Sequence, residues 1–245
     1  DTYLLGEYFQ DSTAHLQGDE LDASMNYQGF NMPMRRWLTP PDKQKIVTDS
    51  PYAYKPSIPA EVMAEQWQLF MSAIPYSIAL QQFNQLDSHD TTRILHVAMD
   101  DKELVKLGTA LMLGFPGVPC IYYGSEIGMS SGDDPHCREA YPWQSTESHN
   151  HELLDFYRKA NHLRHEFPVL RQGQFELSVV NDDLVRVDVR SDEQHLVAWF
   201  NRSDKSFELQ DLEQMSVQGY RRVLAAKEEN TIKNISGENC IVYVS

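Results

Sequence analysis

The sequence predicts an α/β region followed by an all-β region, and two observations support this division. Apolar runs that end in polar residues recur at residues 2–7, 83–90 and 117–126, with helical segments between them. This alternation is typical of a (β/α) barrel, whose parallel strands deliver side chains to one end. After Gly173 the hydrophobic period changes to two, which is the period of half-buried strands.

The C-terminal region is predicted to be an antiparallel β-sandwich. Clean alternation occurs over Leu184–Arg190, and further strands are expected at residues 195–200 and 241–244. Asn, Asp, Ser and Gly residues separate these short strands. We therefore predict one domain over residues 1–172 and a second over residues 173–245.

The amino-acid composition excludes some classes of binding partner. The chain has 245 residues, 41% hydrophobic and 23% charged residues, and a net charge of −15. An acidic protein is a poor ligand for nucleic acid or an anionic membrane surface, so we expect neither as a partner. The odd set Cys120, Cys137 and Cys240 has no Cys-x-x-Cys spacing, which favours free thiols in the reducing cytoplasm.

The elements of the first domain are predicted from local pattern. A buried strand is expected over Thr2–Glu7, a loop or short helix over Tyr8–Gln17, and a second strand over Ala23–Tyr27. Five prolines make residues 39–59 a loop. Apolar residues spaced three and four apart then predict helices over residues 59–74, 101–113 and 151–165. The polar segment Gly128–Trp143 is long for a barrel connection, and such loops are usually functional.

The stretch Phe83–Arg93 contains the most suggestive cluster of ionisable residues. His89 and Asp90 follow an apolar run directly, so a loop there can turn both side chains toward one cavity. An isolated His-Asp pair is a weak signal, and a solvated turn in which Thr91 caps a helix is the alternative. Glu7 ends the first apolar run in the same way, and its alternative is a carboxylate that caps a loop.

Three motifs in order point to a known family. Leu5-Gly6-Glu7, Leu86–Asp90 and Pro119–Glu126 resemble the fifth, seventh and eighth barrel strands of the α-amylase superfamily, glycoside hydrolase family 13. The stretch Leu16–Tyr27, the Asp134-Pro135-His136-Cys137-Arg138 motif and Tyr141-Pro142-Trp143 narrow the resemblance. They are similar to the maltodextrin glucosidase, cyclomaltodextrinase and neopullulanase group, and to maltodextrin glucosidases most closely. The implied fold is the C-terminal half of a (β/α)8 TIM barrel followed by the β-sandwich.

The resemblance implies catalytic roles for Glu7, His89 and Asp90. Glycoside hydrolysis uses a carboxyl group that protonates the leaving oxygen, and Glu7 would be this general acid/base. Its apolar neighbours Leu5, Tyr8 and Phe9 would raise the pKa of its carboxyl by desolvation. Asp90 would bind hydroxyls of the distorted sugar and stabilise the oxocarbenium-like transition state, and His89 would donate hydrogen bonds to the same hydroxyls.

The resemblance also implies substrate-binding roles for Asp134, Arg138 and Phe9. Asp134 and Arg138 would clamp the non-reducing glucose, and Phe9 would offer a flat face to a sugar in the acceptor site. Their alternatives are a surface ion pair and a core aromatic ring. We expect no cofactor and no metal, because the cluster of residues 133–137 lacks zinc spacing and enough oxygen ligands for a hard cation.

The family's nucleophile is an Asp after the fourth strand, which the resemblance places upstream of Glu7. The predicted function is therefore that of a fragment, inactive alone, of a retaining hydrolase of α-1,4-linked maltodextrins. The missing N-terminal half of the barrel would be its partner, and relatives often dimerise through N-terminal elements. A glucan-transferring relative and a non-catalytic glucan-binding scaffold are the alternatives. Because a scaffold needs none of Glu7, His89 and Asp90, their presence together argues against it.

Overall fold

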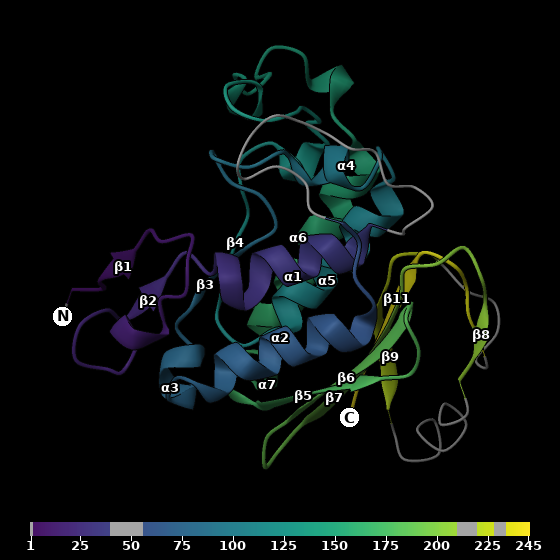
Figure 1. Ribbon diagram of the computed structural model, residues 1–245. Coiled ribbons are helices and arrows are strands. Elements are labelled where there is room, and N and C mark those ends of the chain that lie inside the picture. The colour runs from purple at the N-terminus through teal and green to yellow at the C-terminus, as the bar shows by residue number, and fades with distance from the viewer. Residues whose placement is uncertain (1, 40–55, 210–219, 228–233) are drawn as a thin grey trace.

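The computed structural model describes residues 2–39, 56–209, 220–227 and 234–245. Short parallel strands lie near the N-terminus, an antiparallel sheet is formed by the C-terminal part, and helices lie between them (Figure 1). The first part contains β1 (Leu5–Gly6), β2 (Ala23–Ser24), α1 (Met32–Leu38), α2 (Ala60–Ser72), α3 (Tyr76–Ala79), β3 (Phe83–Gln85), α4 (Ile94–Val97), α5 (Lys102–Gly114), β4 (Val118–Cys120), α6 (His151–Glu166) and α7 (Val169–Gln172). Short helical turns are η1 (Thr13–His15), the π-helix η2 (Tyr27–Asn31), η4 (Ser125–Ile127), η5 (His136–Arg138) and η6 (Thr146–Ser148).

The first part brings β1, β2, β3 and β4 together in chain order with parallel pairing. β1 pairs with β2, β3 pairs with β4, and a parallel bridge between Met25 and Phe83 joins the two pairs. Helices follow β2, β3 and β4, which is the predicted alternation. In such an arrangement the carboxyl ends of all strands meet at one edge. The segments that follow β1 and β3 carry Glu7 and the His89–Asp90 pair to that edge.

The predicted buried strand at the N-terminus is wrong in extent and in burial. β1 covers only Leu5–Gly6, and Tyr3, Leu4 and Leu5 are exposed to solvent. Within the described residues β1 pairs only with β2, so no described strand pairs with its other edge. The predicted strand at residues 23–27 is also shorter, because the chain turns into η2 at Tyr27 and continues as α1.

The long helices confirm the periodicity of the sequence. Asp101 caps α5 by accepting hydrogen bonds from the backbone N–H groups of Glu103 and Leu104, and Asn150 caps α6 through Leu153. The predicted inward faces are buried, including Met63, Trp67, Leu104, Leu107, Leu111, Phe156 and Tyr157. The sequence analysis missed α1, although Met34, Trp37 and Leu38 have helical spacing and are all buried. Most of the predicted proline-rich loop lies outside the described residues.

The C-terminal part is a five-stranded antiparallel sheet of order β5-β6-β7-β11-β9. Its strands are β5 (Gln174–Val179), β6 (Leu184–Arg190), β7 (His195–Asn201), β9 (Arg221–Ala225) and β11 (Asn239–Val244), and β8 (Phe207–Glu208) pairs with β10 (Asn234–Ile235). Both faces of the sheet are apolar. Val185, Val187 and Phe200 join the core shared with α5 and α6, whereas Trp199 and Ile241 pack against the side of β8 and β10.

The core is continuous across the predicted domain boundary. One apolar cluster runs from α1 and α2 through α5 and α6 to β6, β7 and β11. Arg202, at the end of β7, also crosses the boundary: it is buried, pairs with Asp183 at 2.8 Å and donates to the carbonyl of Ile58 at 3.0 Å. α7 ends at Gln172 and β5 begins at Gln174. The division into two domains at Gln172 stays a prediction.

Arg164 ties α6 to the start of β4. Its buried guanidinium donates to the carbonyls of Leu113 at 2.5 Å and Leu170 at 2.6 Å, and also to that of Gly117. Burial, with a smaller contribution from Arg171, lowers the pKa of Arg164 to about 10. The side chain therefore donates hydrogen bonds to the carbonyls of three buried residues.

We expect Arg164→Met to lower the free energy of unfolding by about 3 kcal/mol, because each orphaned buried carbonyl costs about 1 kcal/mol or more. Arg158→Met is the matched control, since Arg158 lies on the same helix with its side chain 69% exposed and pairs with Asp155. Its effect should stay within about 0.5 kcal/mol. Chemical denaturation of both variants measures the difference, and equal effects would remove Arg164 from this structural role.

In the part of the chain that the structure describes, every helix is too short or too polar to span a lipid bilayer.

Candidate active site

The three predicted catalytic side chains come together at the carboxyl edge of the parallel strands. His89 Nε2 lies 3.4 Å from Glu7 Oε1 and 3.4 Å from Asp90 Oδ2. One polar atom from each of the three residues lies within 4.8 Å of the others. Because Glu7 and His89 are far apart in the chain, this proximity comes from the pairing of β1, β2 and β3. The alternative in which His89 and Asp90 belong to an unrelated surface turn is thereby weakened.

The environment of Glu7 differs from the one predicted. Its side chain is 49% exposed, and Leu5 and Tyr8 are themselves exposed to solvent. The sequence predicted that these neighbours would shield the carboxyl from water, and the structure shows that Leu5 and Tyr8 leave it open to solvent. Asp90 is the most covered of the three groups, with 27% of its side chain exposed.

Asp87 supports the turn that carries His89 and Asp90. Its carboxylate is buried and accepts hydrogen bonds from the backbone N–H of Ile94 and from Ser125 Oγ, each at 2.8 Å. Burial raises the pKa of Asp87. The residue thus links the end of β3 to the start of α4 and to η4. The sequence analysis missed Asp87, although its place in the Asp-Ser-His-Asp run after a strand was a usable signal.

Thr91 closes the turn instead of capping a helix. Its hydroxyl accepts a hydrogen bond from the backbone N–H of Ser88 at 2.9 Å, and its own N–H bonds to the carbonyl of Ser88. The residue that precedes α4 is Arg93, and it makes no side-chain cap. The alternative in which Thr91 caps a helix is therefore wrong, although the turn itself is partly open to solvent, since the His89 side chain is 47% exposed.

Tyr27 is a second residue at the site that the sequence analysis missed. Its hydroxyl lies 2.9 Å from Ser88 Oγ, and burial raises the pKa of Tyr27 to about 12. The ring stacks on Phe9 with centroids 4.0 Å apart and an interplanar angle of 15°. Phe9 therefore has one face against a buried ring, and its role as a platform for a sugar stays a prediction.

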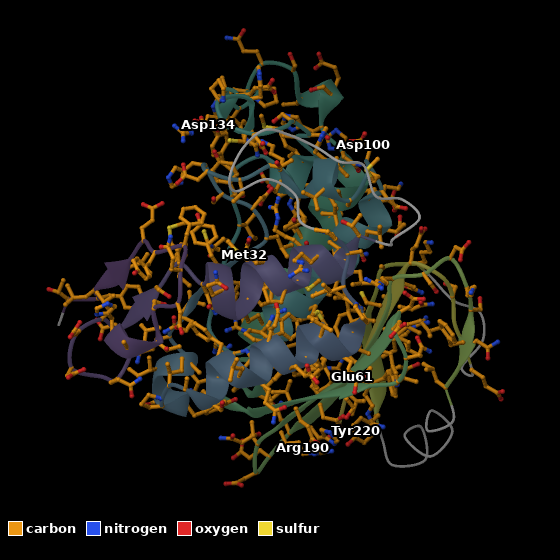
Figure 2. The ribbon with its side chains drawn as sticks, in the orientation of Figure 1. Met32, Glu61, Asp100, Asp134, Arg190 and Tyr220 are labelled. Carbon is orange, nitrogen blue, oxygen red and sulfur yellow. The ribbon has the colours of Figure 1, made fainter. Side chains whose placement is uncertain are left out.

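Asp134 and Arg138 form a half-exposed ion pair, and Arg138 also contacts Asp90. Their role as a glucose clamp stays a prediction. Arg138 Nε is 3.0 Å from Asp134 Oδ1, and Arg138 Nη2 is 2.8 Å from Asp90 Oδ1. Both belong to the segment between β4 and α6, which we call the β4–α6 loop (residues 121–150). Figure 2 shows Asp134 far from Arg190, which ends β6 of the antiparallel sheet. The β4–α6 loop thus approaches the turn of His89 and Asp90.

Among the described residues, Glu7, His89 and Asp90 form the group close enough to hold a cation. Two carboxylates and one imidazole are too few ligands for calcium, which takes six or more oxygens, and zinc is usually bound by Cys or His in larger number. The same three groups suit proton transfer and hydrogen bonding to sugar hydroxyls. The absence of a metal stays a prediction.

Comparison with known proteins places the chain in a family. The protein-family model described as "Alpha amylase, catalytic domain" matches residues 1–151. The chain belongs to the α-amylase family, glycoside hydrolase family 13. The predicted family is therefore confirmed, and the matched region contains Glu7, His89, Asp90, Asp134 and Arg138.

Curated relatives include a cyclomaltodextrinase and a maltogenic alpha-amylase. A cyclomaltodextrinase from Bacillus sp is 32% identical over 207 residues, which cover 84% of this chain and 34% of the relative. A maltogenic alpha-amylase from Bacillus acidopullulyticus is 34% identical over 213 residues, which cover 85% of this chain and 33% of the relative. The chain therefore spans about a third of the length of these relatives.

Solved structures agree in fold. The debranching enzyme of Nostoc punctiforme, soaked with acarbose, superposes with a TM-score of 0.83 at 26% identity and covers 100% of this chain and 50% of its own. A cyclic alpha-maltosyl-(1→6)-maltose hydrolase from Arthrobacter globiformis gives a TM-score of 0.81 at 24% identity, which shows the fold alone. This chain thus has the architecture of half of these α-amylase-family structures.

Proposed function

We propose that this chain is part of a retaining glycoside hydrolase that acts on α-1,4-linked maltodextrins, similar to a maltodextrin glucosidase. The observation that carries the proposal is the proximity of Glu7, His89 and Asp90 at the carboxyl edge of parallel strands, in a chain of the α-amylase family. The names of the cyclomaltodextrinase and the maltogenic amylase support the choice of short α-glucans.

Each side chain then has a role in the reaction. Glu7 donates its proton to the glycosidic oxygen as the bond breaks, and its carboxylate later takes a proton from the attacking water. Asp90 and His89 bind hydroxyls of the reacting glucose, and the negative charge of Asp90 stabilises the positive charge that develops on the ring. Asp134 and Arg138 hold the non-reducing glucose, and Phe9 meets the sugar on the acceptor side.

We further propose that β1 to β4 are the C-terminal half of a (β/α)8 barrel and that the antiparallel sheet belongs to a β-sandwich. Parallel sheets are normally covered on both faces, yet Leu4, Leu5, Val118 and Ile121 are exposed beside the outer edges of β1 and β4. The preceding half-barrel would cover them and bring the nucleophilic Asp. Coverage of only 50% of the Nostoc punctiforme structure supports this completion.

We also propose that the complete enzyme is cytoplasmic. Cys120, Cys137 and Cys240 are free thiols, and a curated relative is the intracellular maltogenic amylase of Bacillus subtilis. Both support a cytoplasmic enzyme. Dimerisation of the complete enzyme through elements upstream of residue 1 remains part of the proposal.

The test compares residues 1–245 with the complete polypeptide that contains them, using maltotriose as substrate. We expect the complete polypeptide to release product in the α-configuration, as NMR of the fresh product detects, and residues 1–245 alone to be inactive. Labelling with 5-fluoroglucosyl fluoride should trap an Asp upstream of Glu7. Turnover by residues 1–245 alone, or a label on Asp90, would contradict the upstream nucleophile. Binding of maltotriose by the complete polypeptide without turnover would indicate a scaffold.

A further inference from the structure

We infer that Arg138 is a positioning residue for Asp90, an inference that rests on the proposed function. Through Arg138 the β4–α6 loop would hold the acid delivered by the neighbouring strand β3. Clamping the terminal glucose alone does not require this contact.

The contacts of Arg138 converge on the two residues of the turn. Its Nη2 donates to Asp90 Oδ1 at 2.8 Å, and its Nε donates to the backbone carbonyl of His89 at 2.7 Å. The adjacent Cys137 Sγ also donates to this carbonyl, at 3.1 Å. Three donors from η5 therefore fix the peptide and the carboxylate of the same turn.

The geometry leaves Asp90 little freedom. One carboxylate oxygen is bound by Arg138, and the other faces His89 Nε2 at 3.4 Å. Within the turn, the backbone N–H of Asp90 donates a hydrogen bond to Ser88 Oγ at 3.2 Å. A carboxylate that must meet the charge of a transition state works best when it is oriented in advance, because reorientation during the reaction costs free energy.

The β4–α6 loop is itself anchored close to Arg138. The backbone N–H of Arg93 donates to the carbonyl of Ser131 at 3.2 Å, and the Thr92 hydroxyl donates to Asp133. These bonds join the segment after β3 to the segment after β4. Arg138 therefore reaches Asp90 from a loop whose position is fixed relative to the turn.

Asp134 gives a matched comparison: it contacts the same guanidinium, whereas the carboxylate of Asp90 pairs with Arg138 and His89 among the described residues. If Arg138 only clamps glucose together with Asp134, loss of either side chain should weaken substrate binding in the same way. If Arg138 positions Asp90, its loss should slow the chemical step, whereas loss of Asp134 should not.

The experiment measures kcat and KM for maltotriose in the complete polypeptide with Arg138→Ala, Arg138→Lys and Asp134→Ala. We expect Arg138→Ala to lower kcat by roughly 10- to 100-fold, because small misplacements of catalytic groups cost up to about 100-fold. The kcat of Arg138→Lys should lie between those of the wild type and Arg138→Ala, since an ammonium cannot make both bonds of the guanidinium. Added guanidinium chloride should restore part of the kcat of Arg138→Ala. Asp134→Ala should mainly raise KM.

A rise of KM in Arg138→Ala with unchanged kcat, matching Asp134→Ala, would overturn the inference. A crystal structure of Arg138→Ala gives a readout that needs no turnover: we expect a displaced Asp90 carboxylate, and an unmoved one would also overturn it. If the wild-type polypeptide hydrolyses no α-glucan, the proposed function fails, and this structure still decides the positioning role.

Discussion

In the complete enzyme, Glu7→Gln should abolish hydrolysis of unactivated maltodextrins while sparing glycosylation by glucosyl fluoride. In the proposed mechanism the Glu7 carboxyl protonates the glycosidic oxygen, and His89 Nε2 lies 3.4 Å from it. The amide of glutamine has the shape of the carboxyl, but its N–H groups are far too weakly acidic to protonate the leaving oxygen. A general acid contributes roughly 100- to 10,000-fold, and only when the leaving group needs a proton. Fluoride leaves without protonation, so the first step should proceed.

The measurement is release of glucose from maltotriose beside the first-turnover burst of fluoride from α-glucosyl fluoride, because later turnovers also need Glu7 as the base. Glu147→Gln is the control, because Glu147 is an exposed residue of η6 in the β4–α6 loop. We expect it to keep the activity of the wild type on both substrates. Equal loss on both substrates in Glu7→Gln would remove Glu7 from the acid role.

Asp90→Asn should lower kcat by roughly 100- to 1,000-fold and change KM far less, as expected for loss of a charge that acts at the transition state. In the proposed mechanism the carboxylate faces the growing positive charge of the sugar ring, where asparagine would provide only a dipole. Its carbonyl oxygen can still accept the hydrogen bond from Arg138, so the turn should keep its conformation.

Steady-state kinetics with maltotriose separates the two parameters, and Asp134→Asn provides the comparison because its effect should fall on KM. An unchanged melting temperature of Asp90→Asn would show that the fold is intact. A change confined to KM would assign Asp90 to ground-state binding instead of transition-state stabilisation.

The sequence by itself determined the family, the long helices and the identity of the three central side chains. Helical spacing and the caps Asp101 and Asn150 encode α5 and α6 locally, because their hydrogen bonds join residues close in the chain. Glu7, His89 and Asp90 could be predicted because motifs fix residue type and order. Their proximity then followed from the rule that parallel strands end at one edge.

Only the tertiary structure decided what surrounds these side chains. The exposure of Glu7 and of β1 depends on whether a neighbouring strand covers them, and local pattern does not encode this. The contact of Arg138 with Asp90 spans 48 residues, and that of Tyr27 with Ser88 spans 61. Asp87 gains its role because Ser125, on another loop, reaches its buried carboxylate. Such contacts depend on how the loops pack on the strands, so the chain must fold before the partners of each side chain are set.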